Sequence, residues 1–328
     1  LHSLRRRQRQ MCIRDRNIVI IGGGFVGLEF ADDLAHSRNV HVVEILDEVL
    51  PLSFDREFGK MAREKLEKKG VTFHLGLSVA KIIGDRIVEG VILSNGEVIE
   101  ADTVLVSVGV APNSELAKKA GLEVDEYGRI LVDRYMRTKD PNIYAIGDVA
   151  SKKNFLLGGA SKAYFSTLAV IEARIAALNL YTHAVGTSVR GILPVYSTKI
   201  GGITLAAAGL IERVAVRIGI DCIPVMIKTV NRHPSSLPGA VTVTLKALFE
   251  RNTLRLLGVQ IAGPESASEM INTAALMIEN NYTAYDIIGT QYATHPLLSA
   301  SPILYPCLLY TSDAADDGES VDLGGRRI

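Results

Sequence analysis

The sequence has little cysteine and no long apolar run. Cys12, Cys222 and Cys307 are the only cysteines among its 328 residues. A membrane span needs roughly 18 consecutive apolar residues, whereas the stretch GGITLAAAGLI is shorter and is followed at once by Glu212 and Arg213. No group of histidine, cysteine and aspartate residues has the spacing of metal ligands. These absences argue against a disulfide scaffold, a membrane-spanning protein and a metal centre.

The two ends of the chain differ from everything between them. Residues 1–16 can be written as a codon string whose reverse complement translates as CLLYTSDAADDGESV, the sequence of residues 307–321. The same string resembles a translated transposase-type sequencing adapter. We therefore interpret residues 1–16 and 307–328 as adapter-derived, non-native sequence and leave them out of the fold prediction. Cys222 then remains alone, which excludes an internal disulfide and favours a reducing, cytoplasmic compartment.

Charge gives no indication of a nucleic-acid partner. The run RRRQR would suggest a basic arm, but it lies in the first excluded segment. The two ends hold eight of the 36 Lys and Arg residues and six of the 36 Asp and Glu residues, so 28 basic and 30 acidic residues remain. About 290 residues lie between the ends, which is enough for two domains of ordinary size.

A glycine-rich turn follows the first apolar run. Residues 17–21 predict a short strand buried on both faces, and three glycines then follow in G-x-G-x-x-G spacing. Gly22 would permit a tight turn, Gly24 would let the backbone approach a pyrophosphate, and Gly27 would let helix and strand pack closely. Taken alone, the pattern also fits a glycine-rich turn without a ligand.

The stretch FVGLEFADDLA predicts the helix after this turn. It places Val26, Phe30 and Leu34 on one helical face. The N-terminal residues Phe25 and Val26 would lie beside the phosphates, because free N–H groups and the helix dipole favour negative charge there.

The stretch NVHVVE predicts a second strand that ends in Glu44, twenty residues after Gly24. A carboxylate at this place accepts hydrogen bonds from the adenosine ribose and repels a 2′-phosphate. No Lys or Arg occurs between Glu44 and Arg56, which favours NADH over NADPH. Strand, turn, helix and carboxylate together predict a dinucleotide-binding domain.

The residues that follow predict the rest of an α/β domain. FDREFGKMAREKLEKKGVTFHLG predicts a helix and then a strand. A hairpin is expected around Asn95 and Gly96, followed by a buried strand that ends at Gly109. Further on, NIYAIGD predicts a strand with Gly147 and Asp148 at its carboxyl end, where open α/β sheets bind ligands. A Gly-Asp pair alone is also a common turn.

Three motifs in order, GGGFVGLE, VSVGVAPN and TKDPNIYAIGD, carry a family resemblance. Their order and spacing resemble the FAD-dependent pyridine-nucleotide disulfide oxidoreductases. The resemblance implies an α/β protein built from three parts. These are a Rossmann-like NAD(H) domain at residues 17–107, the C-terminal part of an FAD domain at 108–185, and an α+β dimerisation domain at 186–306.

The resemblance also assigns roles to single residues. Asp148, next to Gly147, would bind the ribityl chain of the flavin. Gly109 would pass close to NADH, and Glu29 would correspond to a helix glutamate near the nicotinamide, with a plain exposed glutamate as the alternative.

The stretch ASKAYFSTLAVIEARIAALNL predicts a helix, and in the family such a helix points its N-terminus at the flavin pyrimidine ring. A helix N-terminus stabilises the negative charge of reduced flavin. By position, Phe165, Ser166 and Thr167 would be nearest the ring. A purely structural helix is the alternative.

The last third of the chain resembles the dimerisation domain of the family. AVTVTLKALFERNTLRLLGVQIAG predicts a hairpin of long strands. The helix that follows carries Met270, Ala274, Met277 and Ile278 in one stripe, which would face either the domain's own sheet or a partner subunit. Because family members pair through this domain, a homodimer is expected.

A His-Pro pair at His295 matches an acid/base histidine of the related disulfide reductases. The glutamate that orients this histidine in the family is replaced by Ala300. An imidazole without its carboxylate is a weaker and less oriented base. We therefore weigh catalytic proton transfer by His295 against a structural His-Pro turn, and we interpret His233 as a loop residue.

Part of the family pattern is missing. A first glycine-rich motif for FAD and the redox-active cysteine should both precede Asn17, and neither is found there. Cys222 lies far downstream and is interpreted as a buried strand cysteine. We therefore expect an internal-to-C-terminal fragment, itself inactive, that binds NADH without retaining FAD.

The resemblance implies that the parent protein is a homodimeric flavoprotein oxidoreductase. Its branch is similar to the NADH oxidases and CoA-disulfide reductases, which pass hydride from NADH to FAD and on to oxygen, a disulfide or a polysulfide. The alternatives are an NADH-binding redox sensor without turnover and a dihydrolipoamide dehydrogenase-like disulfide reductase. The absent glutamate disfavours the last of these.

Overall fold

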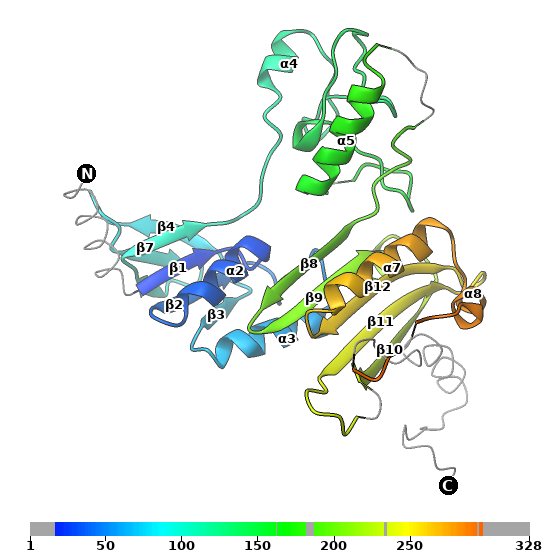
Figure 1. Cartoon of the computed structure of the whole chain (residues 1–328). Coiled ribbons are helices and arrows are strands. Elements are labelled where there is room, and N and C mark those ends of the chain that lie inside the picture. Colours follow the sequence, from blue (N-terminus) through cyan, green and yellow to red (C-terminus); the bar gives the residue numbers. More distant parts are fainter. Residues whose placement is uncertain (1–16, 162, 182–186, 233–234, 294, 298–328) are drawn as a thin grey trace, which may run out of the picture. The chain divides into compact units, whose positions relative to one another are not determined.

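The structure is a computed structural model that describes residues 17–161, 163–181, 187–232, 235–293 and 295–297 (Figure 1). They form two compact units. The first joins the described residues up to Val108 with those from Val195 onward, and the second contains residues 109–194.

Four parallel strands form the first sheet of the larger unit, in the order β3-β2-β1-β7. The bounds are Asn17–Ile21 (β1), Asn39–Glu44 (β2), Thr72–Leu75 (β3) and Thr103–Val106 (β7). Helix α2 (Phe25–Leu34) connects β1 to β2, and α3 (Arg56–Glu67) connects β2 to β3. This order is that of half a Rossmann fold, so the predicted α/β class with a Rossmann-like sheet is confirmed.

A small antiparallel sheet covers one face of the parallel sheet. Its strands are β4 (Val79–Ile83), β5 (Gly90–Leu93) and β6 (Val98–Glu100). Alternate residues of β1 point to opposite faces, so Val19 packs with the small sheet while Ile20 packs with the helices. The predicted hairpin joins β5 to β6, and Gly96 supplies its left-handed residue with φ +88°.

Helix α2 forms as predicted, but the apolar residues placed on one of its faces are not the residues that it buries. Val26 is 56% exposed and Phe30 is 47% exposed, while Leu34 packs at the edge of the core. The helix instead buries its small face against β1, with residues Gly27, Leu28 and Ala31. Gly27 decides this orientation, because only a residue without a side chain lets the helix lie this close to the glycine turn.

The strand predicted to end at Gly109 is shorter and less buried than expected. β7 ends at Val106, which is 57% exposed, and its other residues are only partly covered. The strand lies at the edge of the parallel sheet and pairs only with β1 among the described residues, so one of its sides has no neighbouring strand.

The C-terminal part of the larger unit is a five-stranded antiparallel sheet in the order β10-β11-β12-β9-β8. The bounds are Val195–Ile200 (β8), Ile203–Gly209 (β9), Cys222–Val230 (β10), Thr242–Glu250 (β11) and Leu256–Gly263 (β12). The predicted long hairpin is β11 and β12. Cys222 begins β10 as predicted for a strand cysteine, but it is half-buried rather than buried. Strand ends are less covered than strand centres, and the partial burial raises the pKa of its thiol.

Three helices accompany this sheet, namely α6 (Glu212–Arg217), α7 (Ala267–Glu279) and α8 (Ala284–Gly289). α7 lies across β8, β9 and β12 (Figure 1). Ala274, Met277 and Ile278 are buried and Met270 is partly buried. Of the two faces weighed for this stripe, the helix therefore presents it to its own sheet.

The two sheets of the larger unit share one hydrophobic core. Ile200 and Leu205 of the antiparallel sheet are fully buried in the same cluster as Phe54 and Phe58 of the Rossmann-like part. Tyr196 of β8 packs edge-on against Phe54, with ring centroids 5.7 Å apart, and its hydroxyl donates to the Ser53 carbonyl oxygen at 2.6 Å. The two parts therefore fold against one another.

The smaller unit contains little regular structure. Its helical elements are α4 (Glu115–Lys119), the 3-10 turn η1 (Gly147–Val149) and α5 (Ser166–Leu178). A small core of Ala117, Ile130, Ala145 and Ala150 holds it together. The predicted helix is α5.

The strand predicted at NIYAIGD is wrong. Tyr144 forms a single bridge with Arg137, and the motif ends in η1 rather than in a strand. A strand needs neighbours that satisfy its backbone groups, and within the described residues this segment has only that one bridge. No helix among the described residues is long and apolar enough to cross a membrane.

Candidate dinucleotide site

The glycines of the turn between β1 and α2 have different surroundings. Gly22 has a φ of +108°, in the left-handed region that favours glycine, and a Cβ there would lie 2.4 Å from the Ser107 carbonyl oxygen. A Cβ on Gly27 would lie 2.1 Å from the Gly22 carbonyl oxygen. At Gly24, by contrast, a Cβ would meet no heavy atom of the described chain within 4 Å. Gly22 and Gly27 therefore allow close packing, whereas Gly24 leaves the backbone open to an approaching ligand.

The N-terminus of α2 opens at the same place. Gly24 is its N-cap residue in an extended conformation, without a side chain to cap the helix. The first turn carries no acidic residue, so among the described residues the partial positive charge of this end is not balanced within the helix. A pyrophosphate fits these open N–H groups. Phe25 turns its ring toward Phe54 and Tyr196 instead, while Val26 is exposed.

Glu44 has a structural task that its position in the sequence did not reveal. The side chain is 92% covered, with 8% exposed. One carboxylate oxygen, Oε2, accepts a hydrogen bond from the Gly23 N–H at 2.7 Å, and Oε1 accepts one from the Leu46 N–H at 2.9 Å. Each oxygen has a second lone pair for a ribose hydroxyl. Glu44 therefore stabilises the glycine turn, and its predicted contact with a ribose stays a prediction.

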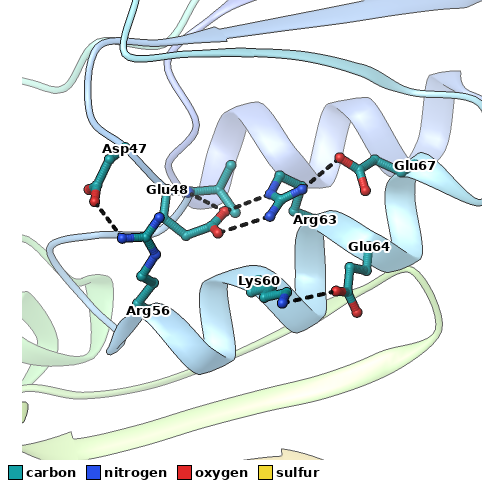
Figure 2. Close-up of polar contacts among 8 residues, drawn as sticks. Asp47, Glu48, Arg56, Lys60, Arg63, Glu64 and Glu67 are labelled. Carbon is teal, nitrogen blue, oxygen red and sulfur yellow. Dashed lines mark hydrogen bonds and ion pairs between the residues drawn. The ribbon is translucent and has the colours of Figure 1, made fainter.

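The loop after β2 is fastened to α3 by ion pairs (Figure 2). Arg63 donates two hydrogen bonds to the buried Glu48, from Nε to Oε1 at 2.9 Å and from Nη2 to Oε2 at 3.2 Å. The pKa of Arg63 is raised by this bond above its ordinary value. The Leu50 N–H in turn donates to the Gly23 carbonyl oxygen at 2.9 Å. The loop is thus held by α3 and is joined to the glycine turn by this backbone hydrogen bond.

Arg56, the first basic residue after Glu44, is engaged by a carboxylate. Its Nη1 lies 3.1 Å from Oδ2 of Asp47, and both side chains are largely exposed (Figure 2). An ion pair this exposed is weak and does not decide between NADH and NADPH, so the preference for NADH stays a prediction.

Glu29 lies on α2 and accepts a hydrogen bond from the Thr198 hydroxyl of β8 at 2.6 Å, on Oε1. The prediction that it approaches a nicotinamide stays a prediction. The structure adds that Glu29 is an exposed helix residue whose carboxylate is hydrogen-bonded to the antiparallel sheet.

In the smaller unit the structure brings the Gly-Asp turn and α5 together. Gly147 has φ +74°, and a Cβ there would lie 3.6 Å from the Ala169 Cβ. Asp148 is exposed beside this contact. Phe165 is the N-cap residue of α5, and Ser166 and Thr167 form its exposed first turn, which carries no acidic residue.

Gly109 begins the smaller unit with φ +102°. A Cβ there would meet no heavy atom of the described residues within 4 Å. Open space at a left-handed glycine suits the predicted close passage of a ligand.

His295 lies on an exposed turn. Its Nδ1 accepts a hydrogen bond from the Leu297 N–H at 3.2 Å, as a structural His-Pro turn would. Ala300, where the orienting glutamate was expected, and His233 both lie outside the described residues. Within the described part of the chain there is no group of three or more potential metal ligands.

Sequence reasoning missed Lys152 and Glu172, which form a buried ion pair under the Gly147 turn at 2.7 Å. The signal was a charged residue inside the apolar helix stretch LAVIEARIAAL. Buried carboxylates in such stretches are nearly always paired.

Two curated relatives resemble the chain over most of its length. The NAD(P)H coenzyme A polysulfide/persulfide reductase of Pyrococcus horikoshii is 34% identical over 281 residues, which are 85% of this chain and 62% of that protein. The NADH oxidase of Methanocaldococcus jannaschii is 30% identical over 288 residues, which are 87% of this chain and 62% of that protein. The chain therefore spans less than two thirds of the length of these relatives.

Solved structures and family models agree with the sequence comparison. A NAD-dependent persulfide reductase from A. fulgidus has a TM-score of 0.88 at 30% identity, covering 97% of this chain and 59% of that one. The model of the pyridine nucleotide-disulphide oxidoreductase dimerisation domain matches residues 195–303. The pyridine nucleotide-disulphide oxidoreductase model matches residues 2–173, a range that begins inside the segment predicted to be non-native. With that match covering more than half of its length, the chain belongs to the pyridine nucleotide-disulphide oxidoreductase family.

Proposed function

We propose that the chain is the NADH-binding and C-terminal part of a flavoprotein oxidoreductase that uses NADH and FAD and passes electrons to a small-molecule acceptor. The observation that carries the proposal is the open backbone at Gly24, at the uncapped N-terminus of α2. The relatives named NADH oxidase and polysulfide/persulfide reductase support it. When bound, NADH supplies a hydride and FAD stores its two electrons.

The residues of the larger unit would hold NADH. The N–H groups at the start of α2 would bind the pyrophosphate, and Glu44 would accept bonds from the adenosine ribose. Glu29 would lie toward the nicotinamide end. Because Glu44 is already fixed by two backbone N–H groups, it would meet the ribose without rearranging.

The residues of the smaller unit would hold the flavin. Asp148 would bind the ribityl chain, and the first turn of α5 would orient the negatively charged edge of the reduced ring. This assignment keeps the predicted FAD part at 108–185 and the dimerisation part at 186–306. We further propose a cytoplasmic homodimer that pairs through the latter.

Among electron acceptors, oxygen and a CoA disulfide or polysulfide fit the two named relatives. A dihydrolipoamide dehydrogenase-like reaction is less well supported, because His295 is an exposed turn residue.

A redox sensor would keep its flavin reduced, whereas the flavin of an enzyme would be reoxidised by the acceptor. Bleaching of flavin absorbance by NADH in the complete protein, followed by recovery with each acceptor, separates the two.

The proposal is tested on the chain by substituting Gly24→Ala. The backbone at Gly24 has φ −80° and open space around it, so a methyl group fits the fold and blocks only an approaching pyrophosphate. NADH affinity, measured by fluorescence titration, should fall at least about tenfold, the scale of one lost close contact. Gly289→Ala, at another open glycine of the same unit, is the control. Unchanged affinity in Gly24→Ala would refute the site.

A further inference from the structure

Lys152 and Glu172 together satisfy both backbone groups of one residue. Glu172 Oε2 accepts a hydrogen bond from the Gly147 N–H at 2.7 Å. The Lys152 ammonium donates to the Gly147 carbonyl oxygen at 2.7 Å and to Glu172 Oε1 at 2.7 Å. The three groups form a closed ring of hydrogen bonds across the two peptide units that meet at Gly147. The Gly147 carbonyl oxygen also accepts a hydrogen bond from the Ala150 N–H at 3.0 Å.

This pair is costly to bury, and stability alone does not explain it. Each side chain is only 1% exposed. Buried ion pairs are often no more stable than well-packed apolar residues of the same volume. What an apolar pair could not do is hold the N–H and the C=O of Gly147, which lie outside any regular strand and have a left-handed φ of +74°.

The position of the turn gives the pair a consequence for the site. Asp148 follows Gly147 directly and is exposed, so the direction of its carboxylate depends on the Gly147 peptide. Since Glu172 neutralises Lys152, the pair fixes this peptide without leaving a free cation to attract Asp148.

We infer that Lys152 and Glu172 are positioning residues, a charged clamp that holds the Gly147 peptide so that Asp148 is presented to the flavin. The inference rests on the proposed function, because Asp148 is the residue proposed to bind the ribityl chain. It adds two residues on different elements, the loop after η1 and helix α5, that act through Asp148 without touching the cofactor.

The clamp itself is tested on the chain by amide hydrogen exchange at Gly147. Lys152→Met and Glu172→Gln should each speed exchange by about tenfold or more, because the amide loses its fixed acceptor geometry. Arg174→Ala, an exposed residue of the same helix, should leave the rate unchanged. Equal rates in all four proteins would overturn the clamp.

A double variant guards against loss of the fold. Lys152→Met combined with Glu172→Gln leaves no unpaired buried charge, and the Gln carbonyl oxygen can still accept the Gly147 N–H. Since the Gly147 carbonyl oxygen has lost its Lys152 donor, exchange at Gly147 should stay about tenfold faster than in the unchanged protein, while circular dichroism shows that the fold is kept. Exchange within about threefold of the unchanged protein would show that the charged pair does not hold Gly147 and would overturn the inference.

The action through Asp148 is tested by FAD affinity in the complete flavoprotein. Asp148→Ala and Lys152→Met should each weaken FAD binding by about tenfold. The variant that combines Asp148→Ala with Lys152→Met should bind FAD no more weakly than Asp148→Ala alone, because the effects of coupled residues are not additive. Additive losses, or normal affinity in Lys152→Met, would overturn the clamp and leave the proposed function standing. Normal affinity in Asp148→Ala would instead refute the proposed flavin contact, whatever Gly147 exchange shows.

Discussion

The Lys246 ammonium of β11 lies 2.9 Å from the carboxylate of Asp55, the N-cap residue of α3, although the two residues belong to different parts of the larger unit. Lys246 also lies 2.8 Å from Glu57 and 2.6 Å from Glu212. The side chain of Gln260 completes the arrangement by exchanging two hydrogen bonds with Asp55. These contacts fasten the Rossmann-like part to the antiparallel sheet.

Replacing Lys246 by Met should destabilise the larger unit strongly. Lys246 and Asp55 are about 95% covered, with 5% and 4% of their side chains exposed, so the substitution leaves a buried carboxylate without its cation. The expected loss in free energy of unfolding is about 3–5 kcal/mol, measured by urea denaturation. Lys228→Met, at an exposed position of β10, is the matched control and should change stability little. A loss no greater than the control's would contradict the role of Lys246.

Stability should fall in acid through Asp55. Burial alone would raise the pKa of this carboxyl, but hydrogen bonds from Lys246, Arg213 N–H and Gln260 outweigh burial and lower it. A group with a lowered folded pKa contributes stability above its unfolded pKa of about 3.9 and loses it as the pH falls through the folded value.

The free energy of unfolding should therefore decrease below about pH 4. In Asp55→Asn the whole curve should be lower, and its slope in this acid range should be smaller. Urea titrations at a series of pH values measure both. An identical slope in the two proteins would show that Asp55 does not carry the effect.

Gly27→Ala should affect the fold, in contrast to Gly24→Ala. The added methyl carbon would lie 2.1 Å from the Gly22 carbonyl oxygen, so α2 must move away from β1. Overpacking of this kind costs about 1–3 kcal/mol. Thermal or urea unfolding should show the loss, together with weaker NADH binding. Wild-type stability in Gly27→Ala would mean that helix and strand are not as closely packed as described.

Tyr196→Phe isolates one bond between the two parts of the larger unit. The substitution removes the hydroxyl that donates to the Ser53 carbonyl oxygen at 2.6 Å and keeps the ring that packs on Phe25 and Phe54. The expected cost is about 1 kcal/mol in urea unfolding. Tyr285→Phe, on an exposed ring, provides the comparison, and an equal effect in both would contradict the prediction.

Local patterns predicted much of the larger unit. The strand–turn–helix around Gly22, the hairpin at Gly96 and the β11–β12 hairpin follow from glycine spacing and alternation, which act over a few residues. Apolar character at Val26 and Phe30 does not indicate which face of α2 is buried, because Gly27 sets the packing. The strand expected before Gly147 is wrong for another reason, since a strand depends on neighbours that its own residues do not encode.

Part of the candidate site follows from local spacing. Spacing alone indicated Gly24 and Glu44 as site residues, because the turn and the carboxylate lie close in sequence, and their roles toward NADH stay predictions. The bonds of Glu29 to Thr198 and of Lys152 to Glu172 join residues far apart in the chain or on separate elements. No short-range pattern contains such pairs, so only the folded chain shows them.

The two bonds from Glu44 to the backbone tie coenzyme choice to the integrity of the turn. Replacing Glu44 in this chain, as a change toward a phosphorylated coenzyme would require, would also leave the Gly23 and Leu46 amides without their acceptors. A substitution at this position that keeps the turn intact must therefore bring a substitute acceptor with it.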